Sequence, residues 1–190
     1  PRRACSTSRP EATKLVPSSG RWIVTNSPAE IWSALREGNS RFTSDHPDHP
    51  RQDSRRRSEI ALSQRPHAAL FGCSDSRISA ELIFDLGLGE LFVVRNAGHI
   101  ISHSVIGSLE YAVSVLGVSL IVVLAHDDCG ALHAAVELES NPEARFPAHV
   151  HSLITELTPA VQRTRLQGGF APDQALSADD IARLRAEGVV

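Results

Sequence analysis

Short apolar runs alternate with amphipathic segments from residue 68 onward. The apolar runs, which we predict to be strands, are AALFGC (68–73), ELFVVRN (90–96) and SLIVVLAH (119–126). The segments between and after them, which we predict to be helices, are SAELIFDLG (79–87), SVIGSLEYAVSVLG (104–117) and GALHAAVELES (130–140). Gly87 and Gly117 are expected to end the first two helices. Apolar strands separated by helices are typical of a parallel sheet covered on both faces. The pattern therefore predicts an α/β fold with a mostly parallel β-sheet flanked by helices.

The residues before the first strand predict two further helices. SPAEIWSALREGNSRF (27–42) has a helical apolar stripe, and Ser27 with Glu30 forms a potential capping box. A loop with two prolines follows, and a second, shorter helix is expected over 54–64. Residues 1–26 are rich in Ser, Pro and Arg without apolar periodicity, so we expect a linker or disordered arm. The predicted domain occupies residues 27–190.

Composition narrows the possible partners and the compartment. The 190 residues carry 19 basic and 22 acidic side chains, a net charge of -3, which predicts no nucleic-acid partner. No apolar stretch approaches the length of a membrane span. Cysteines occur only at positions 5, 73 and 129, which is not a disulfide framework and favours a reducing, cytoplasmic location. The absence of methionine, even at position 1, suggests a piece of a longer polypeptide.

Three side chains that can bind a metal follow the predicted strands. Cys73 ends the first strand, His126 ends the third, and Cys129 lies three residues further on. Because the carboxyl ends of parallel strands meet at one edge of a sheet, these side chains should lie together. Two sulfurs and one imidazole suit zinc and leave a fourth position open for chemistry. The alternative is a pair of buried core thiols beside a hydrogen-bonded histidine.

Two other cysteine chemistries fit the sequence less well. A cysteine-dependent phosphatase needs its Cys and Arg six residues apart, whereas Arg77 lies four residues after Cys73. A thioredoxin-like redox pair needs a C-x-x-C motif, which does not occur in the sequence. The zinc interpretation is therefore preferred.

The motifs CSDSR (73–77), FVVRNAG (92–98) and HDDCG (126–130) together resemble those of the β-class carbonic anhydrases, of the plant-like type. The similarity extends from about residue 27 to about residue 151. It implies a zinc lyase that reversibly hydrates carbon dioxide to bicarbonate and a proton by means of a zinc-bound hydroxide. By position, Cys73, His126 and Cys129 match the zinc ligands of the family.

The same resemblance assigns roles to Asp75 and Arg77. Asp75 is expected to accept a hydrogen bond from the zinc-bound hydroxide, or to become a fourth zinc ligand in a closed state. Arg77, paired with Asp75, is expected to hold it away from the metal. An activity that rises with pH is then expected.

Pocket residues are also implied by the resemblance. They are Gln64, which in the family reaches in from a partner subunit, Phe92, Tyr111 and Gly130. Core packing is an equally good interpretation of Phe92 and Tyr111. If Gln64 acts across an interface, the protein is a homodimer or a higher oligomer. His99 and His103 are further candidates for proton transfer, with a surface role as the alternative.

Two features separate the chain from typical members of this family. The allosteric branch carries Trp where this chain has Leu70, so a bicarbonate-inhibited form is not favoured although Arg95 is present. Residues 166–190 predict a loop, a short helix capped by Ser177 and the start of a strand, so the usual C-terminal end is expected to be missing.

Three functions are compatible with these residues. The first is hydration of carbon dioxide, and the second is hydrolysis of carbonyl sulfide or carbon disulfide on the same site. The third is a non-catalytic bicarbonate-sensing module fused to a membrane anion transporter.

Overall fold

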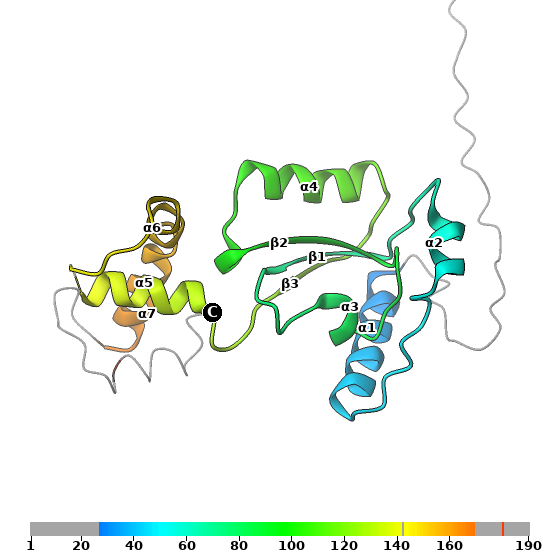
Figure 1. Ribbon diagram of the computed structural model, residues 1–190, viewed down its shortest axis with the longest axis horizontal. Helices are drawn as coiled ribbons and strands as arrows, with labels where there is room; N and C mark the ends of the chain where they lie inside the picture. The colour runs from blue at the N-terminus through cyan, green and yellow to red at the C-terminus, as the bar shows by residue number, and fades with distance from the viewer. Residues whose placement is uncertain (1–26, 142, 170–179, 181–190) are drawn as a thin grey trace, which may run out of the picture.

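The computed structural model describes residues 27–141, 143–169 and 180. Within these residues three parallel strands form one sheet with the order β2-β1-β3. The strands are β1 (Ala68–Cys73), β2 (Leu91–Asn96) and β3 (Ile121–Leu124). Figure 1 shows helices on both sides of the sheet. The predicted α/β fold with a parallel sheet flanked by helices is confirmed.

The helices form two layers and a separate group. Their bounds are α1 (Pro28–Thr43), α2 (Ser54–Ile60), α3 (Ala80–Ile83), the 3-10 turn η1 (Ala97–His99), α4 (His103–Ser114), α5 (Gly130–Ser140), α6 (Ala148–Thr155) and α7 (Thr158–Gln167). In Figure 1, α4 lies along one face of the sheet and α1 and α3 lie on the other. Helices α5, α6 and α7 pack together beyond the carboxyl ends of the strands. No helix among the described residues is long and apolar enough to cross a membrane.

The central strand β1 is buried along its whole length. Leu70 faces α1 and packs with Ile31 and Leu35, whereas Ala69 faces α4 and packs with Ala112. Since both faces of β1 are covered, an uninterrupted apolar run is the pattern that this position requires. This is why the sequence predicted the bounds of β1 correctly, and the last residue of that run is Cys73.

The helix predicted over 79–87 is much shorter in the structure. It ends at Ile83, and Asp85 adopts a left-handed backbone with φ of 48°. The buried Asp85 carboxylate accepts hydrogen bonds from the backbone N–H groups of Asp48 (3.0 Å) and His49 (2.9 Å) and from Arg41 Nε (2.6 Å). Burial alone raises the pKa of Asp85, but these hydrogen bonds hold it below its ordinary value. Long-range hydrogen bonds between Asp85 and the 48–49 loop thus replace the next helical turn. The helix ends before Gly87, so Gly87 is not its stop.

Helix α5 has the predicted bounds, and the other predicted elements are present with shifted ends. Helix α4 ends at Ser114, so Gly117 is not its stop. Helix α1 begins at Pro28, but the side chain of Ser27 makes no capping hydrogen bond, so the predicted capping box is wrong. Helix α2 ends at Ile60 and is capped by Asp53, whose carboxylate accepts from the Arg56 N–H at 2.8 Å. Strand β3 ends at Leu124 rather than at residue 126. The expectations for residues 1–26, and for most of the C-terminal segment after residue 169, lie outside the described residues.

Candidate metal centre

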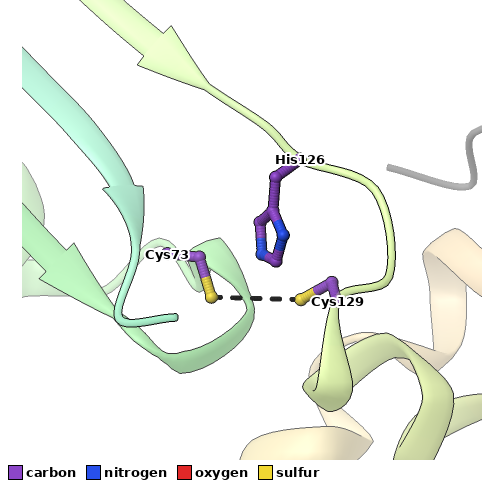
Figure 2. A group of neighbouring side chains, drawn as sticks. All are labelled: Cys73, His126 and Cys129. Atoms are coloured by element: carbon purple, nitrogen blue, oxygen red, sulfur yellow. Dashed lines mark hydrogen bonds between the residues drawn. The ribbon is translucent and has the colours of Figure 1, made fainter. Parts of the chain in front are cut away.

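The carboxyl ends of β1 and β3 bring the three predicted ligands together. Cys73 is the last residue of β1, His126 lies two residues after β3, and Cys129 is the N-cap of α5. The two sulfur atoms are 3.9 Å apart, and the ligand atoms of all three residues lie within 4.8 Å of one another. Figure 2 shows the His126 ring directed toward the two sulfur atoms. Among the described residues, this is the one group with metal-binding geometry.

A tight backbone turn carries the chain from His126 to Cys129. Asp128, in this turn, has a φ of 54°, a left-handed conformation that Asp tolerates better than most residues. The turn ends at Cys129, where α5 begins. The thiol of Cys129 therefore lies at the N-terminus of a helix, whose free N–H groups favour a negative charge.

The geometry fits a zinc ion. Two sulfurs that are each about 2.3 Å from zinc, at a tetrahedral angle, are about 3.8 Å apart, close to the observed separation. Nε2 of His126 is buried and has no hydrogen-bond partner in the described part of the chain. A buried imidazole nitrogen without a partner is costly unless it binds something. The three residues therefore have the donor atoms, the spacing and the unsatisfied nitrogen that a metal ligand set needs.

The two thiols differ in their environment. Burial raises the pKa of the Cys73 thiol, but the backbone N–H of Gly98, the His126 side chain and the backbone of Asp75 outweigh it and lower the pKa. For Cys129 burial dominates and raises the pKa, although backbone N–H groups in the first turn of α5 offset part of the effect. The surroundings therefore favour the thiolate, the form that binds metals, at Cys73 more than at Cys129.

Asp75 and Arg77 form a bidentate ion pair beside the two cysteines. Arg77 donates from Nε to Oδ1 (2.9 Å) and from Nη2 to Oδ2 (2.8 Å) of Asp75, and its backbone N–H also donates to Oδ1 (2.9 Å). These hydrogen bonds hold the pKa of the Asp75 carboxyl far below its ordinary range. Arg77 Nη2 also donates to the carbonyl oxygen of Asp128 at 3.0 Å, and so connects the segment after β1 with the segment after β3.

The predicted pocket residues divide into two groups. Gly130 is the first residue of α5 and adjoins Cys129. Gln64 is exposed and precedes β1, whereas Cys73 ends that strand. The two residues therefore lie toward opposite ends of β1. Phe92 lies near the start of β2 and packs against Tyr111 of α4, with ring centroids 6.1 Å apart. The structure does not bring Gln64, Phe92 or Tyr111 to the metal centre of their own chain.

Sequence reasoning missed the contacts that surround the ligands. Arg95 donates to the carbonyl oxygens of Cys73 and Asp75, and His99 donates to the carbonyl of Leu124. The only signal available in the sequence was the position of Arg95 and His99 around the end of an apolar strand next to β1. Since their partners are main-chain oxygens, no residue pattern could have identified them.

The chain is similar to known proteins over most of its length. A family model described as carbonic anhydrase matches residues 68–187. Carbonic anhydrase 2 of Mycobacterium tuberculosis is 49% identical over 142 residues, which cover 74% of this chain and 68% of that protein. The carbonic anhydrase of Mycolicibacterium smegmatis is 47% identical over 144 residues, covering 75% and 69% of the two chains.

Solved structures show the same similarity. The β-carbonic anhydrase of Coccomyxa, determined in complex with acetazolamide, aligns with 87% of this chain and 71% of its own, with a TM-score of 0.52 and 26% sequence identity. This chain is thus similar in sequence and in fold to proteins described as carbonic anhydrases.

Proposed function

The chain belongs to the β-carbonic anhydrase family, and we propose that it catalyses the reversible hydration of carbon dioxide with a zinc ion held by Cys73, His126 and Cys129. The observation that carries the proposal is the convergence of two thiols and a buried, unpartnered imidazole nitrogen at one point. Zinc bound in such a site supplies a Lewis acid that makes water nucleophilic near neutral pH.

The protein residues control the charge and the orientation of the reacting water. Two thiolates and a neutral imidazole balance the double charge of zinc, so the site acidifies water less than a site of three histidines does. A carboxylate that accepts a hydrogen bond from a zinc-bound water or hydroxide would offset this, because it orients the oxygen so that a free lone pair points at the carbon of the substrate. Asp75, ionised and adjacent to Cys73, is the group that we assign to this task.

Arg77 determines where the Asp75 carboxylate points. Its planar guanidinium binds both carboxylate oxygens and is itself anchored on the Asp128 carbonyl. The pairing of Asp75 with Arg77, and its absence from the group of three ligands, support an open state in which Asp75 does not bind the metal. If Asp75 were released from Arg77, its carboxylate could bind the metal as a fourth ligand and would then occupy the position of the water.

We also propose that the active unit is a homodimer or a higher oligomer. Gln64, Phe92 and Tyr111 lie away from the metal centre of their own chain, so they can line a pocket only at the metal centre of another subunit. Apolar side chains on α4 and β3 are exposed, and Val123 is 67% exposed. An uncovered apolar surface of this kind is typical of a subunit interface. A cytoplasmic location and a fusion to an anion transporter remain predictions from the sequence.

Substrate turnover by one zinc-loaded preparation tests this proposal. Stopped-flow hydration of carbon dioxide is compared with hydrolysis of carbonyl sulfide and carbon disulfide, at pH 7 and pH 9. We expect carbon dioxide to be the preferred substrate and its turnover to be faster at pH 9. Preferred hydrolysis of either sulfur compound would assign the site to that substrate, and no turnover with bound zinc would favour a sensing module.

A further inference from the structure

The segment Arg95–His99 contacts both halves of the metal centre. One half follows β1 and contains Cys73 and Asp75, and the other follows β3 and contains His126 and Cys129. Strand β2, which leads into this segment, pairs with β1 on the side opposite to β3. The segment must therefore pass over the end of β1 to reach β3.

The side chain of Arg95 binds the main chain of the first half. Its Nε donates to the carbonyl oxygen of Cys73 at 2.7 Å, and its Nη2 donates to the carbonyl oxygen of Asp75 at 2.6 Å. Between these acceptors, the N–H of Ser74 donates to the carbonyl of Asn96 at 3.0 Å. The stretch that joins the first ligand to the catalytic carboxylate is thus fixed at three successive residues.

His99 holds the second half. Its Nε2 carries a proton that it donates to the carbonyl oxygen of Leu124, two residues before His126. The His99 ring also meets Phe71 of β1 edge-on, with centroids 5.9 Å apart, and its centroid lies 6.1 Å from that of His126. The ring therefore occupies the space between the ends of β1 and β3.

The backbone of His99 is in a conformation that is strained for a residue other than glycine. Gly98 and His99 both have left-handed conformations, with φ of 78° and 57°. A Cβ atom at residue 98 would lie 2.9 Å from Leu157 and 3.0 Å from Ala131, so the segment is also tightly enclosed. A strained conformation at a non-glycine residue persists only where the surroundings dictate it, and such positions cluster at functional sites.

We propose that Arg95 and His99 are positioning residues that set the separation between Cys73 and the His126–Cys129 pair before the metal binds. The proposal rests on the zinc site proposed above and extends it to two residues that do not bind zinc. A ligand set already held in place loses less conformational entropy when the metal enters. Contacts behind the direct ligands typically change metal affinity by about 10–100-fold.

Two variants of His99 separate positioning from packing. His99→Met removes the donor, and His99→Gln has a side chain of similar length that keeps an N–H donor for the Leu124 carbonyl. Arg95→Lys tests the other half, because one ammonium group does not reproduce the guanidinium fork. His103→Met, at an exposed position four residues from His99, is the matched control.

The measurements are zinc affinity by chelator competition, the absorption spectrum of the cobalt(II)-substituted protein, and the melting temperature of the metal-free protein. We expect His99→Met and Arg95→Lys to weaken zinc binding by about 10–100-fold and to alter the cobalt spectrum. His99→Gln should recover most of the affinity, and His103→Met should match the unaltered protein. A lower melting temperature with unchanged affinity and spectrum would overturn the proposal, since these residues would then support only the fold.

The experiment also distinguishes this inference from the proposed function. If the unaltered chain fails to bind zinc, the zinc site itself is wrong. If the unaltered chain binds zinc and the folded variants bind it equally well, only the positioning role is wrong. Should His99→Met fail to fold, Arg95→Lys and His99→Gln still decide the outcome, because full affinity in Arg95→Lys contradicts the proposal.

Discussion

Arg77 donates three hydrogen bonds to Asp75 and one to the carbonyl of Asp128, although most of its side chain is exposed. An exposed ion pair usually contributes little to stability, so stability does not explain this arrangement. The pair matters for its geometry rather than for its contribution to stability, because Arg77 fixes the direction of a carboxylate next to the metal ligands. The effect of Arg77 should therefore be on catalysis rather than on folding.

Arg77→Lys tests this role. A lysine cannot bind both carboxylate oxygens and the Asp128 carbonyl in one plane, so the Asp75 carboxylate loses its fixed direction. We expect kcat/KM for carbon dioxide hydration to fall at least about tenfold, with zinc retained and the melting temperature nearly unchanged. Arg55→Lys, in the exposed pair with Glu59 on α2, is the control and should keep full activity.

His67 gives a pH-dependent contribution to stability. Burial lowers its pKa below 6.5, and the nearby Arg51 and Arg56 act in the same direction, whereas Glu90 opposes them. Below pH 6.5 the unfolded chain therefore takes up a proton at residue 67 more readily than the folded chain does. By linkage, the stability that neutral His67 provides is present above pH 6.5 and is lost as the pH falls through the lowered pKa.

Replacement of His67 by Gln should flatten this dependence. The free energy of unfolding in urea, measured at pH 7.5 and at pH 5.5, should change less with pH in His67→Gln than in the unaltered protein. His103→Gln, at an exposed position, should keep the original slope. An equal slope in His67→Gln would show that residue 67 does not contribute.

At the scale of elements, α1 and α3 approach each other closely at Gly38. A Cβ atom there would lie 1.9 Å from the carbonyl oxygen of Phe84, a main-chain atom that cannot rotate away. Asn39 Nδ2 also donates to the Ile83 carbonyl at 3.1 Å, which fixes the distance between the two helices. A larger residue at position 38 must therefore separate them.

Gly38→Ala and Gly107→Ala should have opposite effects. Alanine is favoured over glycine in a helix by about 1 kcal/mol, but a forced displacement of packed helices costs about 1–3 kcal/mol. The difference between these two terms lets us expect Gly38→Ala to lower the free energy of unfolding by up to about 2 kcal/mol. Gly107 of α4 has open space around its Cβ position, so Gly107→Ala should raise it by up to about 1 kcal/mol. Equal shifts in urea unfolding would contradict the packing argument.

The elements also show what sequence could and could not predict. Strand β1 was predicted with its bounds because burial on both faces leaves a run of apolar residues. The helix over 79–87 was predicted too long because Asp85 bonds to a loop more than 30 residues away, and no local pattern reports that contact. The metal-binding group could be predicted, since strand ends and residue types suffice. Its supports, Arg95 and His99, could not, because they bind main-chain oxygens.

At the scale of the whole molecule, we expect a complete site to need residues from two chains. Gln64 precedes β1 and Cys73 ends it, so the two lie toward opposite ends of that strand. We therefore expect Gln64 to line the pocket at the metal centre of a partner subunit. A chain with Cys73→Ser keeps Gln64 but lacks a ligand, and a chain with Gln64→Ala keeps the ligands but lacks Gln64. Each homodimer should then have low activity, for different reasons.

Co-expression of the two variant chains tests whether Gln64 acts across the interface. Random pairing places one complete site in half of the dimers, which should restore about a quarter of the original activity. As a control, the Cys73→Ser chain also carries Gln64→Ala, and this mixture should gain nothing. Activity in the first mixture no higher than in the Gln64→Ala homodimer would show that Gln64 does not act from a partner.

Hydration of carbon dioxide before and after removal of zinc tests the central claim most directly. The full chain is assayed by stopped flow as purified, after treatment with a chelator, and after zinc is titrated back. We predict that activity disappears with the metal and returns in proportion to bound zinc, up to one ion per chain, and that Cys129→Ser prevents the recovery. Hydration that persists in the folded, metal-free protein would contradict the assignment of Cys73, His126 and Cys129 as the ligands of a catalytic zinc ion.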